Sequence, residues 1–246
     1  MRTYAIGDIH GHLDLLQDAH DRIARDRAAT GDHEAPIVHL GDLVDRGPNS
    51  RGVVEYLRQG IEAGENWIVL KGNHDRMFAG FVGDIAYQEP GLRLDLGYLH
   101  PRIGGAETLQ SYGIRSAADR PLPPVHAEAV VAVPSAHLDF LNSRPTMYRR
   151  GEAVFVHAGI RPGIPLDAQA ETDLVWIRGG FLDDPRDHGY LVVHGHTALD
   201  APRHYGNRLN LDSGAAYGGL LTAAVIEGRS AWQLMDGRRF ELRPQP

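Results

Sequence analysis

The sequence contains no cysteine, and this absence excludes several kinds of site. A chain of 246 residues without cysteine can form no disulfide, no thiolate zinc site, no iron–sulfur cluster and no cysteine nucleophile. Any metal site must therefore use histidine, aspartate, glutamate or asparagine side chains. The absence also fits a reducing compartment, and we expect the protein in the cytoplasm.

Positive charge is also scarce. The chain has 25 lysines and arginines against 32 acidic residues, which gives a formal net charge of −7. This balance argues against binding of extended nucleic acid and against docking on an anionic membrane. No apolar run approaches the roughly 20 residues that cross a bilayer, and Asp8 and His10 interrupt the N-terminus before any signal-like stretch.

Strand and helix patterns alternate over the first 75 residues. Thr3–Ile9, Ala35–Leu43 and Asn66–Leu70 are apolar runs typical of buried strands. Between them, apolar residues recur at three- and four-residue spacing in 13–23 and 53–61, which predicts two helices. This order predicts an α/β fold in layers, with central β-sheets flanked by helices.

The rest of the chain is predicted to complete a single domain spanning residues 1–246. Gly83–Arg150 is rich in proline and glycine and is interpreted as a helical, cap-like insertion. Strands return at Ala153–Val156 and Tyr190–Val193. From Arg208 to Met235 the pattern predicts a meander of strands, with turns near 212–214 and 227–229.

Glycine-flanked polar residues follow nearly every predicted strand. Alone, each such motif is typical of a turn. Together they predict a ligand crevice, because the carboxyl ends of strands in open α/β sheets line one edge, and glycine lets the backbone approach a ligand there. The motifs are Gly7-Asp8-Ile9-His10-Gly11, Gly41-Asp42-Leu43-Val44-Asp45-Arg46-Gly47, Gly72-Asn73-His74-Asp75, His157-Ala158-Gly159 and His194-Gly195-His196-Thr197.

This set of motifs resembles the calcineurin-like metallophosphoesterases. The Val-Asp-Arg-Gly element at 44–47 is similar to the phosphoprotein phosphatase branch, and within it to small phage and bacterial members such as the lambda phage protein phosphatase and the symmetrical diadenosine tetraphosphatases. Stretches 104–109, 174–178 and 211–214 are also similar to this branch, so the resemblance covers almost the whole chain. It implies a layered metallophosphoesterase fold and metal-dependent hydrolysis of phosphate esters.

The resemblance implies a centre with two divalent ions. Its ligands would be Asp8, His10 and Asp42 for the first ion, and Asp42, Asn73, His157 and His196 for the second, with Asp42 as the bridge. Such a set of carboxylate, imidazole and amide donors suits Mn²⁺, which we expect, as well as Fe or Zn²⁺. Two ions that share a water lower its pKa, so a bridging hydroxide would attack phosphorus without a protein nucleophile.

Roles for the remaining motif residues follow from the same resemblance. Arg46 and Arg178, together with Asn73, would bind the phosphate, because a guanidinium holds phosphate oxygens in bidentate fashion. A surface salt bridge is the alternative for Arg178. His74 would be the general acid that protonates the leaving group, and Asp45 would orient its imidazole.

Two positions near the late Gly-His-Thr motif refine the expectation. Many diesterases and nucleases of this superfamily carry a second histidine where this chain has Ala198, which cannot bind a metal. The sequence therefore favours a phosphatase. His194 would share a strand face with His196 if the strand continued, and we expect it to orient a metal ligand without binding the metal itself.

The expected function is that of a serine/threonine protein phosphatase, with dual specificity towards phosphotyrosine as a possible extension. A symmetrical bis(5'-nucleosyl)-tetraphosphatase that hydrolyses diadenosine tetraphosphate is the first alternative, and hydrolysis of small phosphate esters is another. A catalytically inactive, metal-binding regulatory protein is an alternative of a different class. That reading would require a missing ligand or acid, and none of these positions is missing in the sequence.

Overall fold

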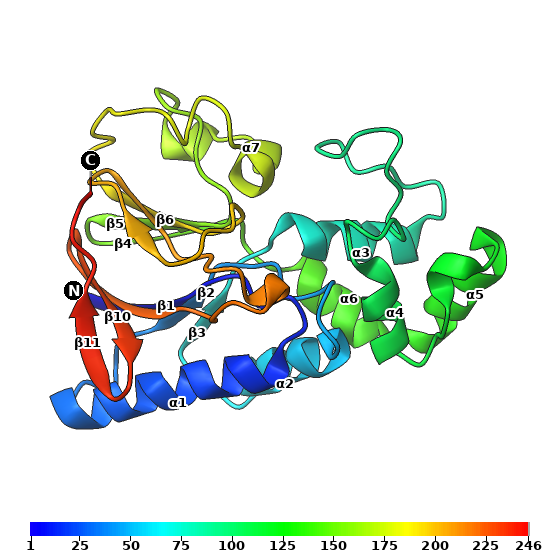
Figure 1. Ribbon diagram of the computed structural model, residues 1–246, viewed down its shortest axis with the longest axis horizontal. Coiled ribbons are helices and arrows are strands. Elements are labelled where there is room, and N and C mark those ends of the chain that lie inside the picture. Colours follow the sequence, from blue (N-terminus) through cyan, green and yellow to red (C-terminus); the bar gives the residue numbers. More distant parts are fainter. Residues whose placement is uncertain (246) are drawn as a thin grey trace.

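Two β-sheets form the centre of the molecule in the computed structural model, which describes residues 1–245 (Figure 1). The first sheet has the strand order β11, β10, β9, β1, β2, β3, and the second has the order β4, β5, β6, β8, β7. The strands are β1 (Arg2–Ile6), β2 (Ile37–His39), β3 (Trp67–Val69), β4 (Met147–Arg150), β5 (Ala153–Val156), β6 (Leu191–His194), β7 (Arg203–His204), β8 (Arg208–Asn210), β9 (Ala223–Glu227), β10 (Ser230–Met235) and β11 (Arg238–Glu241).

Alternation of side chains along the strands explains why the sheets stack. In β1, Tyr4 and Ile6 are buried in the core on the helix-covered face, whereas Ala5 is buried between the two sheets. In β5, Phe155 contributes to the core between the sheets and Val154 to the core on the opposite face. Successive side chains of a strand point to opposite faces, so strands that are apolar throughout must be covered on both sides.

Helices cover both outer faces. The first sheet is covered by α1 (Leu13–Thr30) and α2 (Ser50–Glu62), and α7 (Glu171–Trp176) lies over the second sheet (Figure 1). The side chain of Asn49 caps α2 by accepting a hydrogen bond from the backbone N–H of Gly52 at 3.0 Å. The helix predicted from the spacing in 53–61 is therefore in place within α2, and the predicted α/β fold class with sheets flanked by helices is confirmed.

The middle of the chain is helical. It contains α3 (Asn73–Gly83), α4 (Gly105–Ser111), α5 (Leu122–Ala132), α6 (Ser135–Asn142) and the short 3₁₀ helix η1 (Ala117–Asp119), all to one side of the sheets (Figure 1). Phe78, Leu109 and Phe140 from these helices belong to the same core cluster as Leu57 of α2. Their apolar faces thus continue the core of the first sheet. Whether the segment acts as a cap over a substrate stays a prediction.

The meander predicted for residues 208–235 is only partly correct. β9, β10 and β11 form an antiparallel meander, but β8 pairs with β6 in the second sheet. The segment between β8 and β9 therefore crosses from one sheet to the other and carries the 3₁₀ turn η3 (Ala215–Tyr217), while a further turn, η2 (Leu166–Ala168), precedes α7. No helix within residues 1–245 is long and apolar enough to span a membrane.

Leu57 offers a direct test of the shared core. Its side chain is fully buried, so Leu57→Ala should lower the free energy of unfolding by about 2–5 kcal/mol through lost burial and a residual cavity. Leu94, which is 89% exposed, is the matched control, and Leu94→Ala should change the free energy by no more than about 0.5 kcal/mol. Urea unfolding of both variants measures the difference, and equal losses would contradict this placement of Leu57.

Candidate metal centre

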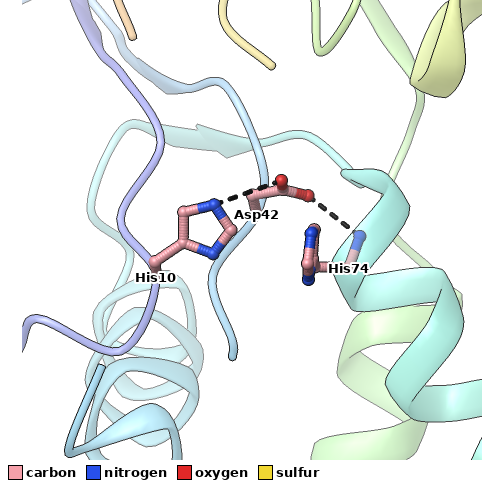
Figure 2. A group of neighbouring side chains, drawn as sticks. All are labelled: His10, Asp42 and His74. Carbon is pink, nitrogen blue, oxygen red and sulfur yellow. Dashed lines mark hydrogen bonds and ion pairs between the residues drawn. The ribbon is translucent and has the colours of Figure 1, made fainter. Parts of the chain in front are cut away.

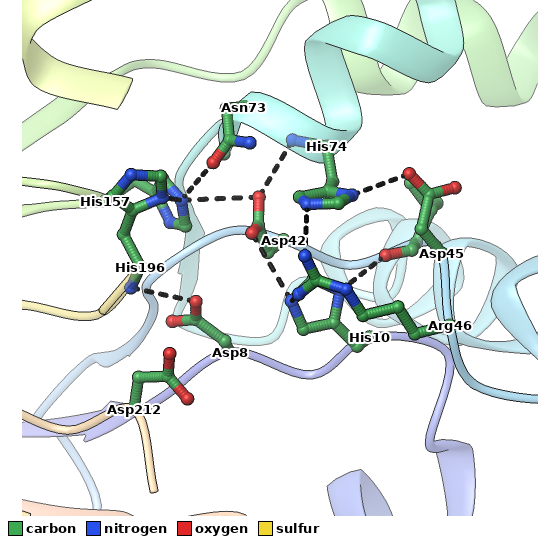
Figure 3. A network of polar contacts seen from close by, with 12 residues as sticks. Asp8, His10, Asp42, Asp45, Arg46, Asn73, His74, His157, His196 and Asp212 are labelled. Carbon is green, nitrogen blue, oxygen red and sulfur yellow. Dashed lines mark hydrogen bonds and ion pairs between the residues drawn. The ribbon is translucent and has the colours of Figure 1, made fainter. Parts of the chain in front are cut away.

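Parallel strands bring the predicted site residues to one edge of the two sheets. β1, β2 and β3 run parallel in the first sheet, and β5 and β6 run parallel in the second. Most of the predicted residues lie just after these strand ends and surround a common centre (Figure 3). They are Asp8, His10, Asp42, Asp45, Arg46, Asn73, His74, His157 and His196. Arg178, which follows α7, lines the same small cavity as Asp42 and His74.

Unusual backbone geometry is concentrated at this centre. Of seven non-glycine residues with positive φ in the described chain, five belong to the predicted site: His10, Asp42, Asp45, Arg46 and His196. Left-handed conformations cost energy for residues with a Cβ, and such residues cluster where a structure must aim side chains at a ligand. The strand-end loops are therefore held in conformations that the sequence alone would not favour.

Two glycines allow the loops to approach the carboxylates. A Cβ on Gly72 would lie 2.2 Å from Oδ1 of Asp42, and a Cβ on Gly195 would lie 1.8 Å from Oδ1 of Asp8. Both distances are far below van der Waals contact, so no other residue fits at either position without displacing a carboxylate. This explains two of the glycines that flank the polar motifs.

Asp42 lies at the middle of the cluster. Its Oδ2 is 3.4 Å from Nε2 of His10, and its Oδ1 is 3.3 Å from Nε2 of His157 and accepts a hydrogen bond from the backbone N–H of His74 at 2.9 Å. Burial by itself would raise the pKa of this carboxyl group. The positive charge that the surrounding imidazoles carry when they are protonated, His157 first among them, outweighs burial and lowers the pKa of Asp42 below its usual range. The carboxylate is therefore charged.

Hydrogen bonds to backbone carbonyls fix the orientation of two imidazoles. Nδ1 of His10 donates to the carbonyl of Val44 at 2.9 Å, and Nδ1 of His157 donates to the carbonyl of Leu40 at 2.9 Å. Because a carbonyl can only accept, the neutral ring in each case turns the lone pair of Nε2 towards Asp42. Burial lowers the pKa of both histidines, which favours this neutral, metal-binding form.

The four residues predicted for the second ion lie together. Nε2 of His157 is 2.8 Å from Oδ1 of Asn73 and 3.2 Å from Nδ1 of His196. Ligand atoms of Asp42, His157 and His196 all lie within 4.8 Å of one another, a spacing suited to one ion. Burial also lowers the pKa of His196, so this ring too is neutral and able to ligate.

A second group that could hold a metal consists of His10, Asp42 and His74 (Figure 2). It differs from the set predicted for the first ion, because His74 takes the place of Asp8 in it. Arg46 lies between the two rings and donates to Nε2 of His10 at 2.7 Å and to Nε2 of His74 at 2.9 Å. Both lone pairs are therefore engaged by a guanidinium, which must move before either nitrogen can bind an ion.

Asp8 lies on the other side of Asp42, in a cluster of buried acids. Its Oδ2 accepts a hydrogen bond from the backbone N–H of His196 at 2.9 Å, while its Oδ1 has no hydrogen-bond partner. Burial, followed by the charges of Asp212 and Asp42, raises the pKa of Asp8, and burial likewise raises the pKa of Asp212 to about 6. The crowded carboxylates and the unpartnered oxygen fit a divalent cation, which would stabilise them.

His196 provides a second unpartnered atom. Its Nε2 is buried without a hydrogen-bond partner, although the edge of its ring lies against Trp176, with the ring centroids 5.7 Å apart. Together with Oδ1 of Asp8, this gives two buried polar atoms that the described protein residues leave unsatisfied. Buried polar groups are normally paired, so these two unpartnered atoms support a ligand-binding site here.

His74 and Asp45 form a buried dyad. Nδ1 of His74 lies 2.7 Å from Oδ2 of Asp45, which is fully buried. Tyr98 and Thr108 both donate hydroxyl hydrogen bonds to the other carboxylate oxygen of Asp45, at 2.6 and 2.7 Å. The sequence reasoning assigned no role to these two donors, which lie more than 50 positions further along the chain.

Arg178 is not engaged in the surface salt bridge considered from the sequence. Its guanidinium donates to the backbone carbonyl of His196 at 3.1 Å, and no ion pair of Arg178 occurs among residues 1–245. It lines a cavity of about 90 Å³ with Arg46 and Asn73. Two cationic side chains thus face the same small space beside Asp42.

His194 differs from its expected placement. β6 ends at His194, and the positive φ of His196 turns the chain, so the two rings do not share a strand face. His194 packs edge-on against Phe181 with ring centroids 5.2 Å apart, and its Nε2 lies 3.4 Å from the guanidinium of Arg208. Burial lowers its pKa to about 3. These contacts place the ring in the packing of the outer face of the second sheet.

Comparisons with known proteins show the family to which the chain belongs. A family model described as calcineurin-like phosphoesterase matches residues 1–221. Serine/threonine-protein phosphatase 1 of Salmonella typhimurium is 27% identical over 92% of this chain and 92% of its own. An asymmetrical bis(5'-nucleosyl)-tetraphosphatase, PrpE of Halalkalibacterium halodurans, is 23% identical over 91% of this chain and 89% of its own. The structure of a cold-active protein tyrosine phosphatase has a similar fold, with a TM-score of 0.64 at 20% identity, covering 99% of this chain and 79% of that one.

Asp8→Asn tests whether the acidic cluster is built for cations. The raised pKa of Asp8 means that its charged form destabilises the fold above the ordinary aspartate pKa, and the neutral amide removes this cost. In EDTA at pH 7.5 the variant should therefore melt a few degrees above the wild type, and in Mn²⁺ it should gain less stability than the wild type.

Thermal denaturation in the two buffers measures both effects. Asp95→Asn is the matched control, because Asp95 is exposed and its carboxylate pairs with Arg93 on the surface. The control should follow the wild type in both buffers. A variant that melts below the wild type in EDTA and gains equally from Mn²⁺ would show that Asp8 has a structural role only.

Proposed function

The chain belongs to the calcineurin-like phosphoesterase family of metal-dependent phosphoester hydrolases, and we propose that it hydrolyses phosphate monoesters, with phosphoserine and phosphothreonine in proteins as the foremost substrates. The observation that carries the proposal is the small cavity in which Arg46 and Arg178 face Asp42 and His74. It suits a single phosphate group. Ala198 stands where related diesterases carry another histidine, which also favours monoesters.

The metal ligands are proposed from the residues around Asp42. Asp8, His10 and Asp42 would hold one ion, and Asp42, Asn73, His157 and His196 the other. When bound, two divalent ions supply an activated water near neutral pH and neutralise charge on the phosphate. The oxygen and imidazole donors suit Mn²⁺, Fe or Zn²⁺, and we propose Mn²⁺.

The chain's own side chains would orient the phosphate and move one proton. Arg46 donates from one terminal nitrogen to His10 and from the other to His74, and once it leaves these rings it would clamp phosphate oxygens in bidentate fashion. Arg178 and the amide of Asn73 would contact the remaining oxygens. His74 would deliver a proton from Nε2 to the departing oxygen, while Asp45 holds Nδ1 and thereby the orientation of the ring.

Hydrolysis of bis(5'-nucleosyl)-tetraphosphates is the second candidate. The specific support is the PrpE relative, whose similarity extends over 91% of this chain. The same centre would then cleave a phosphoanhydride, and the products would tell the two forms of the activity apart: two molecules of ADP from symmetrical cleavage, or ATP and AMP from asymmetrical cleavage. We keep the cytoplasm as the proposed location and a phosphoprotein or small phosphate ester as the proposed partner.

Two assays test the proposal. p-Nitrophenyl phosphate should be hydrolysed with added Mn²⁺ and left intact in EDTA, and an absence of metal-dependent turnover would refute the enzyme claim. A phosphoserine peptide and diadenosine tetraphosphate should then be compared at the same Mn²⁺ concentration. A higher kcat/KM for the dinucleotide would replace the first substrate class with the second.

His74→Asn tests the proposed general acid. The variant should lower kcat by roughly 10²–10⁴, with a larger loss for esters with poor leaving groups, because these depend most on protonation. Metal content per chain should stay near that of the wild type. His33→Asn, at an exposed position, is the control and should change neither quantity. A fall in metal content in step with activity would instead make His74 a ligand, in line with its grouping with His10 and Asp42.

A further inference from the structure

An exposed tyrosine lies beside the arginine that is proposed to hold the phosphate. Tyr217, the last residue of η3, is 69% exposed, and the guanidinium of Arg46 lies 5.4 Å from the centroid of its ring. Gly214 and Gly218 adopt left-handed conformations on either side of this turn, with φ of 74° and 86°. The turn therefore sets where the side chain leaves the backbone, and burial does not hold the ring.

Two open cavities meet at this ring. One has a volume of about 450 Å³ and is lined by Arg46 and Arg102 as well as Tyr217, and the other, also of about 450 Å³, is lined by Leu199 and Gly219 as well as Tyr217. Arg46 lines the first of these and also the small cavity beside Asp42. A substrate whose phosphate is held by Arg46 therefore has room for its leaving group next to the ring.

The exposed face of the ring suits a flat, aromatic group. An exposed tyrosine ring offers a large, rigid surface at a low cost in side-chain entropy, and aromatic rings stack on it in offset or edge-on geometry. Nucleobases stack on such rings without regard to their sequence. Gly214, Gly218 and Gly219 add no side chains beside the ring, and Leu199 and Asp200 line the same cavity.

We propose that Tyr217 determines substrate specificity, by stacking against the planar aromatic leaving group of a phosphate ester whose phosphate lies at Arg46. The proposal rests on phosphate cleavage at the neighbouring centre. It does not rest on phosphoserine and phosphothreonine as substrates, because neither has a planar leaving group. The planar group can come from a tyrosyl side chain or from the base of a departing nucleotide, and the shelf formed by Tyr217 would serve either source.

The contact with Arg46 supplies a rival role for the ring. Tyr217 could act only by holding the guanidinium through a cation–π interaction. Removing the ring would then slow every substrate by the same factor, because all of them use Arg46. The stacking role predicts a loss that depends on the shape of the leaving group.

Benzyl phosphate and cyclohexylmethyl phosphate separate the two roles. Both release a primary alcohol of similar size, and only the first is planar. In Mn²⁺ the wild type should show a kcat/KM about 3- to 10-fold higher for benzyl phosphate, on the scale of one aromatic pair. Tyr217→Phe should keep this preference, and Tyr217→Leu should bring the ratio close to one. Leu220→Ala, at a neighbouring position that is 59% exposed, should leave the ratio unaffected.

The outcomes distinguish the inference from the function on which it depends. If neither ester is turned over in Mn²⁺, the proposed phosphatase function fails. If both are turned over equally by the wild type, or if Tyr217→Leu slows both by one factor, only the shelf is refuted. The wild type and Tyr217→Leu should then be compared on a phosphotyrosine peptide and on diadenosine tetraphosphate. Tyr217→Leu should lower kcat/KM only for the substrate whose planar group stacks on the ring, and this assigns the source of that group. If Tyr217→Leu lowers kcat/KM for neither substrate, the shelf is also refuted.

Discussion

The charge of Asp42 is the constraint on which the site depends. A buried carboxylate is costly unless a positive charge compensates for it. Here the neutral imidazoles of His10 and His157 approach it from loops of different sheets with lone pairs that a cation could share. The backbone N–H of His74 completes its contacts. One side chain on the β2 loop thereby ties together the ends of β1, β3 and β5. The two sheets are stacked so that their carboxyl edges coincide at this carboxylate.

Electrostatic crowding and backbone strain have the same explanation. Asp8, Asp42 and Asp212 lie close enough that the charge of one raises the pKa of another, and an oxygen of Asp8 remains unpartnered. Left-handed residues and glycines without room for a Cβ are needed to bring these groups together. In the absence of cations, these costs at one edge lower the stability of the fold. Divalent ions, which this family of hydrolases uses, would offset the repulsion on binding.

Much of this arrangement could be predicted from the sequence, because its signals are local. Apolar runs of strand length marked β1, β2, β3, β5 and β6, and each ended in a glycine-flanked polar motif. The crevice follows from the rule that parallel strands share a carboxyl edge. The sequence could not show that β8 joins the second sheet, because strand partners are chosen by long-range pairing. The two-residue β7 and the edge strand β4 carry too little pattern to be recognised.

The difference between local signals and long-range contacts also applies to the site. Residues inside the motifs were predicted, whereas Tyr98, Asp212 and Tyr217 were not, since their relevance arises only when distant segments fold together. Tyr98 reaches Asp45 across 53 positions. Asp212 lies in a stretch that resembles the phosphatase branch, but its proximity to Asp8 depends on the crossing between the sheets. His194 is a different case. A strand face shared with His196 was expected if the strand continued, and the left-handed conformation of His196 ends the strand first.

We propose that Asp42 would contribute an oxygen to each of two metal ions. The most direct measurement is a crystal structure of the protein grown with Mn²⁺, with anomalous difference maps calculated at the manganese edge. Two peaks beside Asp42 would bear out this proposal, the first contacting Asp8 and His10 and the second contacting Asn73, His157 and His196. A single peak, or peaks that do not contact Asp42, would contradict it.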